Sequence, residues 1–64
     1  MIKLTRLNEE VFYINPHLIE KVEQKGDTII TMDSQIQYIV KEKFDEIYKK
    51  IILYRRKISI GGQE

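Results

Sequence analysis

The chain has 64 residues, of which 42% are hydrophobic and 33% are charged, and it contains no Cys and one His. This length predicts a single domain, and the composition excludes disulfides, thiolate zinc sites and a histidine-rich metal cage. The formal net charge of +1 does not predict a nucleic-acid or membrane partner. Because small domains often rely on disulfides, metals or oligomerisation, we expect self-association to supply the missing stabilisation.

The first 40 residues are rich in β-branched and aromatic residues, in short runs separated by turn signals, which is typical of strands. In the second run, Phe12 and Ile14 share one face of the expected strand, and Val11 and Tyr13 share the other. The connections are too short for parallel crossovers, so the strands must be antiparallel. We predict five strands, at residues 2–7, 11–15, 18–23, 28–32 and 36–40, the third entered through a short helical turn.

From Lys43 the spacing of the apolar residues changes from two to about 3.6, which predicts an amphipathic helix at residues 43–57. The basic residues Arg55, Arg56 and Lys57 would lie in its last turn, where they complement the helix dipole. Gly61-Gly62 predicts the end of the helical segment and a flexible tail at residues 61–64. The apolar stripe of this helix comprises Phe44, Ile47, Tyr48, Ile51, Tyr54 and Ile58.

The expected fold class is therefore mainly β (α+β). About five short antiparallel strands within residues 2–40 form a small sheet or barrel-like core, and one C-terminal amphipathic helix follows them. We expect residues 1–60 to form a single small domain.

The charges are distributed unevenly along the chain. Residues 1–42 carry five basic and seven acidic residues, a net charge of −2, whereas residues 43–57 carry six basic and two acidic residues, a net charge of +4. Lys3 and Arg6 interrupt the first residues before an apolar stretch can form, so we expect no signal peptide. The longest apolar run, residues 51–54, is far shorter than a membrane helix needs, so we expect a cytoplasmic protein without membrane insertion.

The residues available for catalysis are few. His17 follows Pro16 in a predicted turn, and neither Ser34 nor Ser59 has a rigid setting for a nucleophile. The neighbouring carboxylates are all expected on exposed turns, strand faces or the helix start, and no glycine-rich phosphate loop is present. We therefore expect a protein that is not an enzyme and has no cofactor, metal site or small-molecule substrate.

The helix surface offers a better candidate for function. Leu53 falls opposite the apolar stripe, among basic residues, and Val11, Tyr13 and Ile39 lie on the second face of the sheet. We predict that Leu53 and this second sheet face join copies of the chain into a homo-oligomer. We further predict that Tyr54, Arg55 and Arg56 form the exposed end of the helix and dock onto an acidic partner. No stacking aromatic residues are expected among these cations, which argues against single-stranded RNA as the partner.

An ordered set of residues extends across about residues 1–56. It comprises Ile2, Leu4-Thr5, Leu7-Asn8, Phe12, Asn15, Leu18-Ile19-Glu20, Glu23, Asp27-Thr28, Ile30, Tyr38, Val40, Glu42, Ile51 and Tyr54-Arg55. Together these residues resemble the small flagellar FlbD-type proteins, also called the swarming-motility SwrD family. This resemblance implies a non-enzymatic cytoplasmic factor at or near the flagellar base. It also implies support of motor power or swarming, through flagellar motor or stator proteins as partners.

The chain departs from this family pattern at three places. Members often have Gly after the Asn of the first turn and another Gly in the turn before the last strand, where this chain has Glu9 and the segment 33–35. A small capping residue usually precedes the helix, where this chain has Lys43. These departures bear on the turn types and on the helix cap.

Leu4-Thr5-Arg6 and the segment 45–51 carry a second, weaker resemblance. They are similar to the carbon storage regulator family of intertwined five-stranded dimers that bind messenger RNA. Phe44 stands where that family has an RNA-contacting Arg, and its glycine-aspartate turn and Ala-Pro segment are missing. A small RNA-binding regulator is therefore the alternative function.

Overall fold

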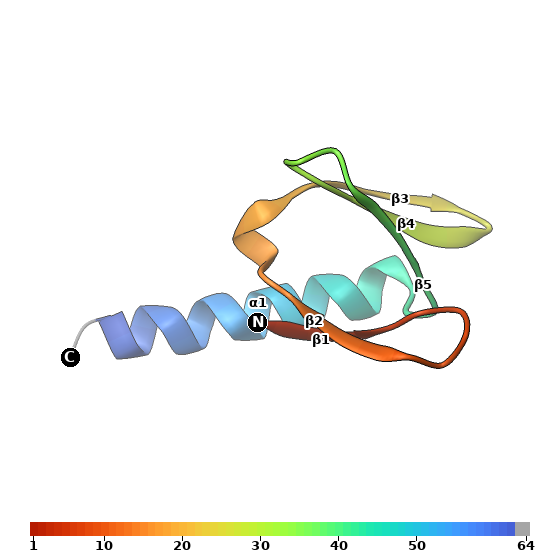
Figure 1. Ribbon diagram of the computed structural model, residues 1–64. Coiled ribbons are helices and arrows are strands. Elements are labelled where there is room, and N and C mark those ends of the chain that lie inside the picture. The colour runs from red at the N-terminus through yellow and green to blue at the C-terminus, as the bar shows by residue number, and fades with distance from the viewer. Residues whose placement is uncertain (63–64) are drawn as a thin grey trace.

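A computed structural model describes the backbone of residues 1–62 and the side chains of residues 1–57. Figure 1 shows the strands of the first part of the chain followed by one long C-terminal helix. The elements are β1 (Ile2–Thr5), β2 (Val11–Ile14), a 3-10 helix (Pro16–Leu18), β3 (Ile19–Lys25), β4 (Asp27–Met32), β5 (Gln37–Val40) and α1 (Phe44–Gly62).

The five strands form two antiparallel sheets. β1 and β2 make a hairpin, and β3, β4 and β5 make a three-stranded meander. The sheets meet where Arg6 and Val40 form an isolated antiparallel bridge and where the Lys41 backbone N–H donates to the Thr5 carbonyl over 2.9 Å. The predicted five antiparallel strands and the C-terminal helix are therefore confirmed.

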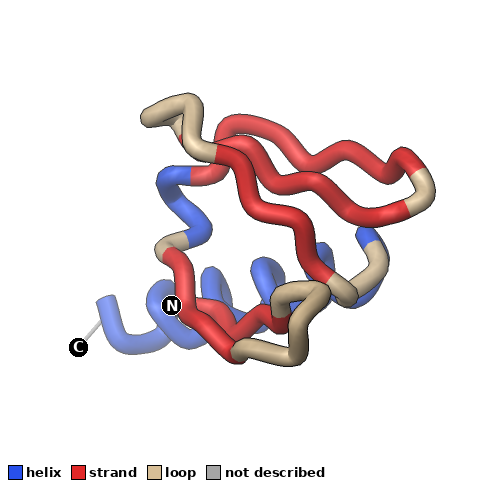
Figure 2. Tube along the Cα trace, turned by 45° about the vertical axis from the view of Figure 1, so that its right-hand side comes forward, coloured by secondary structure: helices blue, strands red, loops and turns tan. Residues whose placement is uncertain are grey.

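The core lies between the two sheets and α1. Alternation within the strands turns every second side chain inward, so Ile2 and Leu4 are buried while Lys3 is exposed. In Figures 1 and 2, α1 runs across one side of both sheets, and its C-terminal part extends past them. The buried apolar side chains are those of Ile2, Leu4, Ile14, Ile30, Met32, Val40 and Ile47.

The two faces of β2 are as predicted. Ile14 is buried and Phe12 packs against the core, whereas Val11 and Tyr13 are exposed. Ile39 of β5 is also exposed, so the second sheet face predicted for self-association is open to solvent in the single chain.

The three tight turns each contain a residue in the left-handed backbone region. Gly26 has φ +73°, which glycine adopts without steric cost. Glu9 and Gln35 have φ +76° and +75°, at the two turns where the related family often has Gly. In this chain the same turns therefore form with side chains present, at a conformational cost.

The helix begins at Phe44 and is capped from a distant strand. Lys43 occupies the cap position, and its carbonyl accepts the first helical hydrogen bond from the Ile47 N–H over 3.1 Å. The Phe44 N–H has no partner within the helix and donates instead to Oε1 of Gln24, on β3, over 3.1 Å. The same oxygen accepts from the Thr28 hydroxyl over 3.1 Å. Gln24 thus replaces the missing small capping residue.

The helix ends later than the predicted residue 57. α1 continues to Gly62, so residues 61 and 62 are helical rather than part of a tail, and residues 63 and 64 lie outside the described residues. Glycine permits a helix to end but does not force it, and adding a residue to an existing helix costs little.

The predicted apolar stripe is only partly buried. Ile47 is fully buried, and Ile51 and Tyr54 pack against the core, but Phe44 and Tyr48 are about half exposed. The Phe44 and Tyr48 rings stack on one another instead, with centroids 6.1 Å apart. α1 contacts mainly β1 and β3, so only the middle of the stripe meets the sheets. The side chain of Ile58 lies outside the described residues.

Candidate interaction surface

The predicted interaction residues lie in the middle of α1 rather than at its end. Because the helix continues to Gly62, Arg55 and Arg56 are not in its last turn, although both are exposed. Leu53 is 56% exposed, as its place opposite the core stripe predicted. Tyr54 differs from the prediction of an exposed residue: it packs against the core, with its ring edge against His17 at 5.6 Å between centroids.

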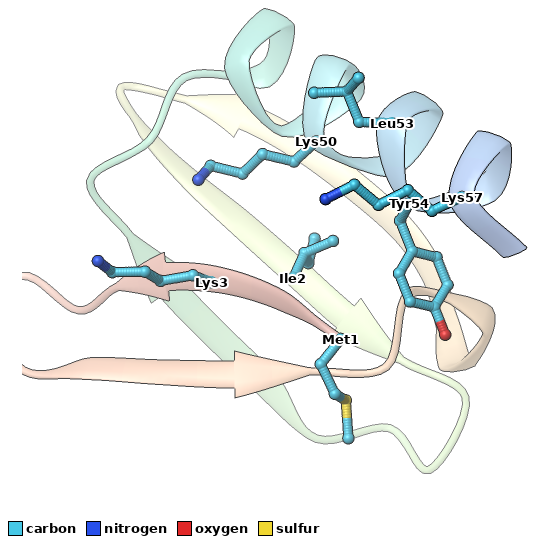
Figure 3. A pocket seen from close by; sticks show the side chains of 7 residues that line it. All are labelled: Met1, Ile2, Lys3, Lys50, Leu53, Tyr54 and Lys57. Atoms are coloured by element: carbon cyan, nitrogen blue, oxygen red, sulfur yellow. The ribbon is translucent and has the colours of Figure 1, made fainter.

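A hollow of about 200 Å³ lies between the start of β1 and the middle of α1. Figure 3 shows three lysines from these two elements around it, Lys3 from β1 and Lys50 and Lys57 from α1. The apolar part of its lining comes from Met1, Ile2, Leu53 and Tyr54.

A second hollow lies on the other side of Leu53. It is lined by the apolar parts of Tyr48, Ile52 and Leu53 and by two further cations, Lys49 and Arg56. Leu53 therefore forms the ridge between the two hollows. Tyr48 also places an aromatic ring among these cations, contrary to the prediction that none would be there.

We call this surface the cationic face. It consists of the ridge residue Leu53, the two hollows beside it and the cations around them. These cations are Lys3, Lys49, Lys50, Arg56 and Lys57.

The cations of the cationic face differ from those of the sheets in their partners. The ion pairs found within the described residues join Arg6 to Glu10, Lys21 and Lys25 to Glu23, and Lys41 to Glu9. The residues of these ion pairs all lie on strands or turns. Within residues 1–57, no carboxylate lines either hollow or forms an ion pair with a cation of the cationic face. This face therefore presents cations without ion-pair partners around an apolar centre.

The carboxylate of Glu42 interacts electrostatically with Lys50 of this face. Burial of its carboxylate raises its pKa, but hydrogen bonds from Thr5 and the positive charge of Lys50 outweigh this effect and lower the pKa below its ordinary value. The carboxylate of Glu42 accepts two hydrogen bonds from Thr5, and these hold β1 beside the start of α1.

Arg6, the residue shared with the RNA-binding family, interacts with other side chains of the same chain. Its guanidinium lies over the Phe12 ring at 4.4 Å and near the Tyr38 ring at 5.3 Å, and its Nε is 3.0 Å from Oε1 of Glu10. Cation–π contacts of this kind use the flat face that would stack on a base. The arrangement gives no support to an RNA-contacting role for Arg6.

Of the residues considered for catalysis, Ser34 is exposed in the turn after β4, and the side chain of Ser59 lies outside the described residues. His17 is exposed on the 3-10 helix, where its backbone N–H donates to Oδ1 of Asn15 over 3.0 Å. Within the described residues, no group of three or more His, Asp or Glu residues is placed to hold a metal ion. Among the described residues, no helix is long and apolar enough to cross a membrane.

Sequence reasoning missed Lys3, Met1 and Ile2 as parts of the surface. They meet α1 only through the packing of β1 against residues about 50 positions later in the chain. The positive charge of residues 49–57 was visible in the sequence, but nothing local indicated that the first strand contributes a lysine to it.

The architecture and this surface define a small α+β protein with a cationic helix face as its candidate site. The model of the FlbD family, described as flagellar and swarming motility proteins, matches residues 1–59, and the chain belongs to this family. This match confirms the family expected from the sequence. No curated protein and no solved structure gives a significant match to the chain.

Proposed function

We propose that this protein is a non-enzymatic accessory factor of flagellar motility, which supports motor power or swarming by docking onto an acidic surface of the motor, at its stator. The family associates the chain with flagellar and swarming motility. The observation that carries the docking role is the cationic face, whose charges have no carboxylate partner within residues 1–57 and surround the exposed Leu53.

We also propose that the protein acts in the cytoplasm, at the flagellar base, as a homo-oligomer. Val11, Tyr13 and Ile39 expose apolar side chains on the outer faces of the two sheets. Burying such side chains against a second copy stabilises a domain whose own core is small.

The participation of Leu53 in self-association stays a prediction. The cations around Leu53 would meet the same cations of a second copy in a symmetric contact, and like charges repel. The charge distribution therefore favours the outer sheet faces for self-association and leaves Leu53 available for a partner.

A motility assay tests the proposed function. In a strain lacking this protein, the variant Arg55→Glu/Arg56→Glu should fail to restore swimming and swarming, because it reverses the charge of Arg56 on the cationic face and of its exposed neighbour Arg55. The variant Lys21→Glu/Lys25→Glu is the matched control, since it makes the same change in net charge on exposed residues of β3. Both variants should melt close to the wild type, because all four substituted side chains are exposed. The exposed ion pairs of Lys21 and Lys25 with Glu23, which the control removes, contribute little to stability. Full motility with the arginine variant would exclude the proposal.

A further inference from the structure

The two hollows beside Leu53 have the form of a binding site for a peptide segment. Each has an apolar wall and an open mouth, and the volume of the first is about 200 Å³. An enclosed apolar cavity of about 150 Å³ holds a benzene molecule, so the first hollow has room for one apolar side chain. Because Leu53 lies between the hollows, a segment that crosses it would place one side chain on each side.

The charges around the hollows indicate which charge the bound segment should carry beside its apolar residues. Lys3, Lys50 and Lys57 surround the first hollow, and Lys49 and Arg56 line the second. None of these five forms an ion pair within residues 1–57, whereas Arg6, Lys21, Lys25 and Lys41 of the sheet region all do. A ligand with carboxylates on both sides of its apolar residues would be complementary to this arrangement.

We infer that the cationic face binds an acidic peptide segment of a partner protein, with two apolar side chains in the hollows on either side of Leu53 and carboxylates beside the surrounding lysines and Arg56. This inference rests on the proposed function and names the chemistry of its partner.

Other occupants fit the surface less well. A second copy would bring like charges together, as argued above. A lipid surface is flat and would leave the two hollows unfilled. Single-stranded RNA would need exposed rings for its bases. Tyr48 and Tyr54 supply two rings, but Tyr54 packs against the core, and the remaining apolar lining near Leu53 consists of Met1, Ile2 and Ile52, which do not stack on bases.

Peptide selection tests the inference without knowledge of the partner. The full chain is immobilised and panned with a library of random peptides displayed on phage, and the variant Lys50→Glu/Lys57→Glu is panned in parallel. The wild type should enrich peptides of net negative charge with apolar residues between the acids. A synthetic peptide of the enriched sequence should bind the lysine variant at least about tenfold more weakly than the wild type.

Two controls separate the site from general charge effects. The variant Lys21→Glu/Lys25→Glu carries the same change in net charge and should bind the selected peptide as the wild type does. Leu53→Ser removes the ridge without changing the charge and should also weaken binding. Thermal melting of each variant, compared with the wild type, checks that the fold is retained.

Several results would overturn the inference. These are no enrichment over the starting library, enrichment of neutral or basic peptides, or equal loss of binding in the Lys21→Glu/Lys25→Glu control. Vesicles of phosphatidylcholine and phosphatidylglycerol and a single-stranded oligouridylate are measured in the same assay. Tighter binding of either one than of the selected peptide, dependent on Lys50 and Lys57, would assign the face to a membrane or to RNA instead.

The outcomes distinguish this inference from the proposed function. Selection of acidic peptides together with full motility of the Arg55→Glu/Arg56→Glu and Lys50→Glu/Lys57→Glu variants would support the binding site and exclude the motility role. Loss of motility without any acidic peptide selected would support the motility role and exclude this ligand.

Discussion

The carboxylate of Glu42 accepts two hydrogen bonds from Thr5, one from the backbone N–H to Oε1 and one from the hydroxyl to Oε2, each 2.9 Å long. The two residues are 37 positions apart, so this pair joins the end of β1 to the segment that leads into α1. Hydrogen bonds to an ionised group are stronger than those between neutral groups.

The Thr5–Glu42 pair should make stability depend on pH. The pKa of Glu42 is below its ordinary value of 4.5 in the folded chain, so its ionised form stabilises the fold. This contribution is present above pH 4.5, decreases as the pH falls below that value, and is lost once the pH is below the folded-state pKa. Glu42→Gln should lower the free energy of unfolding near neutral pH by about 1–2 kcal/mol.

Urea denaturation of the wild type and of Glu42→Gln over the acidic range measures this effect. The difference between the two proteins should shrink as the pH falls below 4.5. Glu20→Gln, on the exposed part of β3, serves as a control that should change little. A difference between wild type and Glu42→Gln that is the same at every pH would contradict the assigned role.

Replacing Gln35 by glycine should stabilise the protein. Gln35 has φ +75°, a conformation that costs a residue with a side chain about 1–2 kcal/mol. Glycine removes that cost but adds entropy to the unfolded chain, worth about 0.4–1 kcal/mol. We expect a net gain of about 0.5–1 kcal/mol, or a rise in melting temperature of about 2–8 °C, measured by thermal unfolding.

Glu9 has the same backbone conformation, but Glu9→Gly should stabilise the protein less than Gln35→Gly does. Its carboxylate pairs with Nζ of Lys41, and glycine would remove that pair as well. Ser34→Gly, next to Gln35 but without positive φ, should give no stabilisation and is the control. If Gln35→Gly melted below the wild type, the strain assigned to this turn would be absent.

The cap supplied by Gln24 can be tested together with Lys43. Gln24→Ala leaves the Phe44 N–H without its acceptor and should destabilise the protein by about 1 kcal/mol. Lys43→Ser provides a local N-cap and should recover the part of this loss that comes from the Phe44 N–H. The part that comes from the buried Thr28 hydroxyl, which also loses its acceptor, should remain. Chemical denaturation measures all four combinations as a double-mutant cycle.

Lys43→Ala is the control for this cycle, because alanine removes the lysine without supplying an acceptor. It should not rescue Gln24→Ala. Equal stability of Gln24→Ala and the wild type would show that water satisfies the Phe44 N–H and that Gln24 has no capping role.

Self-association should depend on the outer sheet faces. We expect the wild type to sediment as an oligomer at micromolar concentration and Val11→Ser/Tyr13→Ser to sediment as a monomer, because the double variant removes exposed apolar side chains. Ile36→Ser changes an exposed apolar residue outside β5 and should leave the oligomer intact. Leu53→Ser shows whether the helix ridge takes part. A monomeric wild type would rule out the homo-oligomer.

The strands were predictable from the sequence because their signals are local. Alternation in β2 correctly placed Ile14 and Tyr13 on opposite faces, and the structure buries the first and exposes the second. At the two turns where the family often has Gly, this chain has Glu9 and the segment 33–35, and the structure gives Glu9 and Gln35 positive φ. The short helical turn predicted before the third strand is the 3-10 helix Pro16–Leu18.

The surroundings of the helix were harder to predict, because they depend on which strands reach it. Periodicity placed Phe44 and Tyr48 on the core stripe, but the sheets cover only the middle of α1. The contribution of Lys3 to the cationic face could not be predicted, because it requires knowing that β1 packs beside residues 50–57. Gln24 as a helix cap likewise arises from contact between β3 and the start of α1.

The pairing of each strand only with a neighbour in sequence has a consequence for how the chain folds. The hairpin of β1 and β2 and the meander of β3, β4 and β5 can each form from local contacts, which are fast to make. The two halves are then joined at residues 5–6 and 40–42, through the Arg6–Val40 bridge and the Thr5–Glu42 pair. Loop closure between these two points is therefore the step expected to set the folding rate, and a ribosome must release residue 42 before the two halves can join.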